Sequence, residues 1–154
     1  MKMRILRAKE KKEIFRLLKE QWGFDKQLDL VFLATPKGNI YVASREIFRL
    51  PLELLRQTSI GLYFGELHEG IRLSIEGSQL VGPASTKNVV ELNDTEVISW
   101  LKGNDLKKRG EWFGYVLLKH GKDFLGCGKY KPEEGKILNF IPKARRLGIA
   151  VEGD

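Results

Sequence analysis

Apolar residues in the first part of the chain follow a helical period and then an alternating one. Between Ala8 and Trp22 the apolar side chains fall on one helical face, with Lys and Glu elsewhere, which predicts an amphipathic helix. Residues 28–34 and 40–43 are then separated by Thr35-Pro36-Lys37-Gly38. Pro at the second and Gly at the fourth position favour a type I turn, so we predict a β-hairpin.

The pattern continues with short elements up to residue 84. Ser44 can cap a short helix over 44–48, and Pro51 is expected to begin another that carries residues 54 and 55. Apolar residues then alternate over 60–64 and over 71–75, on either side of a turn at His68-Glu69-Gly70. This alternation predicts a second hairpin with one buried face.

The organisation changes near residues 81–85, a short segment with Gly and Pro that we take as a boundary. A strand is expected over 88–92, followed by a helix that begins at the capping box of Asn93 and Glu96, buries Trp100 and ends at Gly103. Further strands are expected over 113–119, 123–131 and 136–141. We therefore predict an α+β protein with a small α+β unit at residues 1–84 and a small, mainly β barrel at residues 85–154.

Charge is concentrated in the second unit. The chain has a net charge of +7, and residues 102–148 hold 12 Lys and Arg against 5 Asp and Glu, while the remaining residues hold 15 of each sign. Aromatic residues are interleaved with these cations. Because phosphate backbones with unstacked bases suit such a surface, nucleic acid is the first partner to consider, with a merely solubilising surface as the alternative.

The candidate nucleic-acid contacts form three basic groups, to which Lys102 and Phe140 are added. One group is the segment 107–109, a second consists of alternating lysines on one face of a strand, and a third surrounds the chain after Pro142, where an arginine can make a forked contact to phosphate. Phe140 is a candidate for base stacking, although a core position is equally compatible with its place in the sequence. The complete set is Lys102, Lys107, Lys108, Arg109, Lys129, Lys131, Phe140, Lys143, Arg145 and Arg146.

Other chemistry finds little support in the sequence. The chain has no phosphate-binding loop and no dinucleotide fingerprint, and one Cys with two distant His residues gives no metal-ligand spacing. Cys127, between two glycines, is expected to be structural, and Glu133-Glu134 is expected to be solvated in a turn. We expect neither an enzyme nor a cofactor or metal.

The expected cellular setting follows from composition. There is no apolar run of about 18 residues, and the single cysteine excludes an internal disulfide, so we expect a cytoplasmic protein without a membrane partner. The richness in Lys and Glu is also seen in heat-adapted proteins, which hints at a thermophilic source.

Residues 85–150 resemble a PUA domain, an RNA-binding pseudobarrel, through segments 100–106, 109–110 and 125–129. Segments 114–119, 125–130 and 139–146 more specifically resemble the C-terminal RNA-binding region of Sun-type RNA cytosine-C5 methyltransferases. Residues 61–66 and 72–74 resemble the pre-PUA unit that precedes a PUA domain in some archaeal RNA-binding and ribosome-assembly proteins.

The resemblance implies a pre-PUA unit followed by a PUA-like pseudobarrel, with the 107–109 loop beside the RNA-binding groove. It implies a non-catalytic module that binds structured RNA, either tRNA or rRNA, as an accessory factor in RNA modification or ribosome biogenesis. An alternative is a subunit that docks through residues 1–80 onto an RNA methyltransferase or a ribosome-assembly factor. A small hydrolase or nuclease acting through Cys127, a His or the Glu pair is the remaining alternative.

Overall fold

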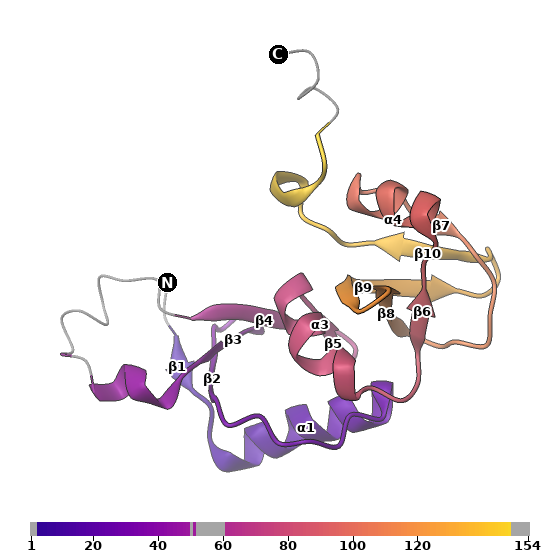
Figure 1. Cartoon of the computed structure of the whole chain (residues 1–154). Helices are drawn as coiled ribbons and strands as arrows, with labels where there is room; N and C mark the ends of the chain where they lie inside the picture. Colours follow the sequence, from indigo (N-terminus) through magenta and orange to yellow (C-terminus); the bar gives the residue numbers. More distant parts are fainter. Residues whose placement is uncertain (1–2, 50, 52–60, 149–154) are drawn as a thin grey trace.

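The computed structural model describes residues 3–49, 51 and 61–148, which form an α+β protein with two five-stranded sheets (Figure 1). The short helix expected from Pro51 onward lies outside the described residues. We call the two sheets the N-terminal sheet and the C-terminal sheet. The strands of the N-terminal sheet lie between residues 4 and 73, and those of the C-terminal sheet lie between residues 89 and 139.

The N-terminal sheet is antiparallel, and its strands follow the order of the chain. Helix α1 (Ala8–Trp22) has the bounds predicted from its apolar face, and it ends at Gly23 in the left-handed conformation (φ 68°). Its buried side chains, Ile14, Leu18 and Trp22, share a core with Phe32 of the sheet. The strands are β1 (Arg4–Ile5), β2 (Val31–Ala34), β3 (Asn39–Ala43), β4 (Leu62–Leu67) and β5 (Ile71–Leu73). Both predicted hairpins are therefore confirmed.

Ser44 and Ser74 lie just before two short helices in this half. Ser44 precedes the 3-10 helix η1 (Arg45–Arg49), and its Oγ accepts a hydrogen bond from the Glu46 amide at 3.2 Å, as its capping role predicts. The extension of β5 to Ile75 was wrong, because Ile75 begins helix α3 (Ile75–Val81). Ser74 ends the strand by capping this helix, accepting from the Gly77 amide at 2.9 Å while its own hydroxyl donates to the Tyr63 carbonyl at 2.6 Å.

The C-terminal sheet is curled into a half-barrel with the strand order β6-β8-β9-β10-β7, in which β6 runs parallel to β8 and the other neighbours are antiparallel. The predicted capping box is confirmed: the Asn93 side chain accepts from the Glu96 amide at 2.8 Å, and the Asn93 amide donates to the Glu96 carboxylate at 2.9 Å. The elements are η2 (Gly82–Ala84), β6 (Val89–Glu91), α4 (Asp94–Leu101), β7 (Leu106–Lys107), β8 (Tyr115–His120), β9 (Asp123–Lys131), β10 (Lys136–Asn139) and η3 (Lys143–Arg145). Strand β7 was not predicted.

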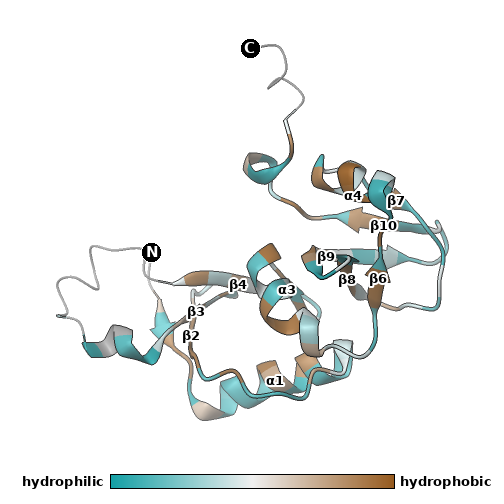
Figure 2. Ribbon diagram, viewed as in Figure 1, coloured by the Kyte–Doolittle hydropathy of each residue, from teal (hydrophilic) through white to brown (hydrophobic). Residues whose placement is uncertain are grey.

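The C-terminal sheet packs on both faces, so the molecule has two apolar cores. On one face Val116, Leu118 and Ile137 pack with Trp100 of α4, which confirms Trp100 as a core residue. The opposite face contributes further side chains to the core of the N-terminal sheet, namely Tyr115, Leu117, Phe124 and Cys127. Helices α3 and α4, which lie beside this sheet, both carry hydrophobic residues (Figure 2).

A buried hydrogen bond reinforces the contact between the two halves. Trp22 Nε1, at the end of α1, donates to the Tyr115 carbonyl of β8 at 3.1 Å, and both groups belong to the shared core. The segment proposed as a boundary coincides with η2, between α3 and β6. Among the described residues, no helix is long and apolar enough to cross a membrane.

Candidate nucleic-acid interface

Four lysines gather on one face of the C-terminal sheet. In the antiparallel register Lys136 lies directly opposite Lys107 of β7 and also opposite Lys131 of β9. Lys129, two residues before Lys131, lies on the same face because side chains alternate along a strand. We call Lys107, Lys129, Lys131 and Lys136 the lysine face.

This arrangement is unfavourable for folding, because like charges directly opposite each other across strands destabilise a sheet. Lys136 is partly compensated by Glu134, with an Nζ to carboxylate distance of 3.1 Å. Within the part of the chain that the structure describes, Lys107, Lys129 and Lys131 make no ion pair. A polyanion would relieve the repulsion in such a row of opposed cations, only one of which has a carboxylate partner among the described residues.

A chain of cations and aromatic rings leads from the lysine face toward the N-terminal sheet. Lys129 Nζ lies 4.8 Å from the centre of the Tyr115 ring, and the Tyr115 and Phe140 rings meet edge to face with centroids 6.3 Å apart. The Arg72 guanidinium then stacks on Phe140, 4.3 Å from its centroid. Phe140 packs against the shared core and remains partly exposed beside cations, and its role in base stacking stays a prediction.

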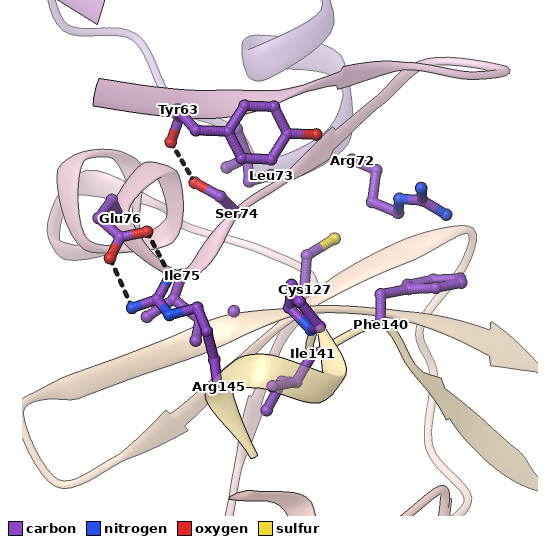
Figure 3. Close-up of a pocket in the computed structure, with 12 residues that line it drawn as sticks. Tyr63, Arg72, Leu73, Ser74, Ile75, Glu76, Cys127, Phe140, Ile141 and Arg145 are labelled. Carbon is purple, nitrogen blue, oxygen red and sulfur yellow. Dashed lines mark hydrogen bonds and ion pairs between the residues drawn. The ribbon is translucent and has the colours of Figure 1, made fainter. Parts of the chain in front are cut away.

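A groove opens beside Arg72 and Phe140, between the N-terminal sheet with α3 and the C-terminal sheet (Figure 3). Its volume is about 370 Å³. In Figure 3 Tyr63 lies on one side of the groove, and Cys127, Phe140 and Ile141 lie on the other. The remaining walls are Arg72, Leu73, Ser74, Ile75, Glu76, Gly126, Pro142 and Arg145.

An ion pair forms one end of the groove. Both Arg145 terminal nitrogens donate to the Glu76 carboxylate, at 2.6 and 2.7 Å. The hydrogen bond from Arg145 lowers the pKa of Glu76, and the hydrogen bond to Glu76 raises the pKa of Arg145. The fork of Arg145, predicted as a phosphate contact, therefore already has a carboxylate partner that an RNA phosphate would have to displace or share.

The segment 107–109 does not act as a single patch, because its residues point to different sides of β7. Lys107 lies on the lysine face, whereas Lys108 reaches Glu96 of α4 on the opposite side, with an Nζ to carboxylate distance of 2.9 Å. Arg109 donates from Nη1 to the Pro132 carbonyl at 2.9 Å and covers the turn that joins β9 to β10. The RNA contacts predicted for Lys108 and Arg109 stay predictions.

A second basic group surrounds the η3 turn beside the end of α4. Arg146 donates from Nε to the Ile141 carbonyl at 2.9 Å, and its side chain lies so close to Gly103 that a Cβ there would stand 2.4 Å from it. Lys102 and Lys143 are exposed near the same turn. These residues, with Arg145, form a basic group separate from the lysine face.

Cys127, the nucleophile named in the catalytic alternative, lies in the core shared by the two sheets. Cys127 is 3% exposed, and burial raises the pKa of its thiol to about 12 despite the nearby cations Arg72 and Lys129. It is therefore a neutral core residue near pH 7. His120 contacts Asp94 at 2.8 Å on the surface. No group of three or more His, Cys, Asp or Glu side chains that could hold a metal is found among the described residues.

Sequence reasoning missed three members of this interface. Lys136 could have been found, because Lys131 and Lys136 flank a four-residue turn and must face each other in a hairpin. Arg72 and Tyr63 belong to the half that was considered neutral and were not expected beside a basic surface. Their proximity to Phe140 and Arg145 depends on how the two sheets pack, which no local pattern contains.

The curled C-terminal sheet is consistent with a PUA-like pseudobarrel. Residues 87–147, which hold the whole C-terminal sheet, match the family model of the methyltransferase RsmF PUA domain. The chain is also similar to two proteins called ribosomal RNA small subunit methyltransferase F. The relative from Aeromonas hydrophila is 26% identical over 133 residues, covering 81% of this chain, and one from Vibrio cholerae is 23% identical over 143 residues, covering 88%.

The resemblance to the C-terminal region of Sun-type methyltransferases, expected from the sequence, is thereby confirmed. The matched region is 28% of the length of each of these relatives. The likeness extends beyond the residues of the PUA match, since 81% and 88% of the chain are covered.

Proposed function

We propose that this protein binds structured RNA, tRNA or rRNA, as a non-catalytic module that assists RNA modification or ribosome assembly. The observation that carries the proposal is the row of directly opposed lysines on a PUA-type sheet. The sequence division into a pre-PUA-like unit (1–84) and a PUA-like domain (85–154) is part of this proposal, as is a cytoplasmic location, where such RNA is found.

The lysine face would bind through phosphates. Lys107, Lys131 and Lys136 come from three adjacent strands and so present a row of charges across the sheet. Phosphate contacts of this kind fix the position of the RNA, whereas sequence preference must come from exposed bases or 2′-hydroxyls. Lys102, Lys143, Arg145 and Arg146 would extend the contact around the η3 turn.

The absence of catalysis is supported by two observations. The family model that matches residues 87–147 is the PUA domain of a methyltransferase and not its catalytic domain. The described residues also bring together no nucleophile, base and orienting group, since Cys127 is buried with a raised pKa.

The test measures binding of the purified chain to a folded tRNA and to duplex DNA. Binding is monitored by fluorescence anisotropy at several salt concentrations. The charge-reversal pair Lys107→Glu with Lys131→Glu is compared with Lys9→Glu with Lys12→Glu, two exposed lysines of α1. We expect preference for RNA and loss of binding in the first pair but not in the second. Equal loss in both pairs, or no binding by the unchanged protein at low salt, would refute the proposal.

A second candidate function, protein docking, is favoured by an apolar row on the outer face of the N-terminal sheet. Ile5, Leu33, Tyr41 and Tyr63 lie opposite one another across β1 to β4, with Ile5 52% and Tyr63 37% exposed. The proposed occupant is an RNA methyltransferase that lacks its own RNA-binding region. A purified catalytic domain of that kind should bind after nuclease treatment and lose binding with Ile5→Glu.

A further inference from the structure

We infer that the groove between the two sheets receives one unstacked nucleobase of the bound RNA. This inference rests on the proposed function, because it names what one nucleotide of the ligand does at a site separate from the lysine face. The base would lie between Tyr63 and the surface formed by Cys127 and Phe140.

The dimensions and walls of the groove suit a planar, mostly apolar group. Its volume of about 370 Å³ lies at the lower end of the range of small-molecule sites, about 300 to 1,000 Å³. One wall is the ring of Tyr63, and the opposite wall includes Phe140 and the side chain of Ile141 (Figure 3). Aromatic walls bind bases without regard to sequence, because every base has a π face.

The polar groups at the two ends match the rest of a nucleotide. Arg72 donates from Nη2 to Glu66, and a guanidinium has five N–H groups, so Arg72 keeps donors for a phosphate or a ribose oxygen. At the other end the Glu76 and Arg145 pair offers both acceptors and donors, which the edge of a base can engage. Ser74 contributes less, since its hydroxyl already donates to Tyr63 and accepts from Gly77.

The position of the groove also favours a base that belongs to a longer strand. The contacts from Arg72 to Phe140, from Phe140 to Tyr115 and from Tyr115 to Lys129 connect it to the lysine face. A strand whose phosphates follow the lysines would thus reach Arg72 at the mouth of the groove. A free nucleotide would use the groove alone and gain nothing from the lysine face.

The test uses two RNA hairpins that differ by one nucleotide, one with a single bulged 2-aminopurine and one in which an added uridine pairs with that base. Stacking of the bulged base on Tyr63 should quench its fluorescence. From the usual contribution of base stacking on an aromatic side chain, we expect Tyr63→Ala to weaken binding of the bulged hairpin about 5- to 100-fold. Tyr63→Phe, which keeps the ring, should bind like the unchanged protein, as should Phe113→Ala, an exposed aromatic outside the groove.

The outcomes separate this inference from the proposed function. Equal binding of both hairpins without quenching would overturn the nucleobase site and leave RNA binding intact. Failure to bind either hairpin at low salt would overturn the proposed function itself. If Tyr63→Ala does not fold, Tyr63→Leu, which removes the ring but keeps an apolar side chain, provides the same comparison. Binding of free AMP as tightly as the bulged hairpin would overturn the assignment to an RNA strand.

Discussion

The lysine face predicts that loss of RNA binding and gain of stability occur together. In the double variant Lys107→Gln with Lys131→Gln, Lys136 no longer faces a cation on either side. Each opposed pair of like charges costs a few tenths of a kcal/mol at an exposed position, so relieving two pairs should stabilise the fold by about 0.5 kcal/mol. The same change removes two phosphate contacts.

The effect on binding can be worked out from the number of cations. If the four lysines and Arg72 each contact a phosphate of single-stranded RNA, the logarithm of affinity should fall against the logarithm of salt with a slope of about −3.5. Two fewer contacts reduce the slope to about −2. At about 0.1 M salt, this difference corresponds to a loss of affinity of roughly 20-fold.

The assays are anisotropy titrations with labelled RNA over a range of salt concentrations and urea unfolding followed by tryptophan fluorescence. The matched control is Lys9→Gln with Lys12→Gln on α1, which removes the same charge from exposed positions away from the sheet. The control should keep the slope of the unchanged protein. An unchanged slope in the lysine-face variant, or the same decrease in the control, would refute the assignment of these lysines.

Three further predictions concern the interior and the groove. Trp22→Phe should lower the free energy of unfolding by about 1 to 3 kcal/mol in urea titrations, because the buried Tyr115 carbonyl loses its donor; an unchanged midpoint would contradict this. Cys127 should react with a thiol reagent at pH 8 much more slowly in the native protein than in urea, since burial raises its pKa to about 12; equal rates would show an accessible thiolate. The pKa of Glu76 is lowered by its hydrogen bond from Arg145, so the pair stabilises the fold above the ordinary Glu pKa and this contribution disappears as pH falls through the lowered value. Glu76→Gln should therefore flatten the acid side of the stability curve, measured by unfolding between about pH 6 and pH 3.

Elements with a strong local signal could be predicted from the sequence. Helix α1 has four apolar residues at helical spacing, and its predicted bounds agree with the structure. The Asn93 and Glu96 capping box identified the start of α4 in the same way, because both of its hydrogen bonds lie within three residues. Strand β9 also has the predicted bounds.

Elements that depend on distant contacts could not be predicted. The alternation of Ile71, Leu73 and Ile75 favoured a longer strand, but Ile75 turns into α3, where Gly77 lies against the backbone of Phe64. Strand β7 has two residues and exists because it pairs with β10, about 30 residues further along the chain. Such short edge strands carry no period of their own.

The residues of the candidate site could likewise be predicted only where their placement depends on local alternation along a strand. Alternation correctly placed Lys129 and Lys131 on one side of β9 and Tyr130 on the other, where Tyr130 is buried. It could not show that Lys108 is held by Glu96 or that Arg145 is held by Glu76, because these partners are 12 and 69 residues away. The groove itself is formed by two sheets and has no counterpart in any single segment.

The core shared by the two sheets has a consequence for how mutations will be interpreted. Leu117, Phe124 and Cys127 of the C-terminal sheet are buried by residues of the N-terminal half, and Trp22 adds a hydrogen bond across the contact. A chain cut at residue 84 would expose these side chains to water, and we expect the intact protein to unfold in a single cooperative transition. A substitution deep in α1 can then lower RNA binding simply by reducing the folded population, so every binding defect has to be compared at equal folded fraction.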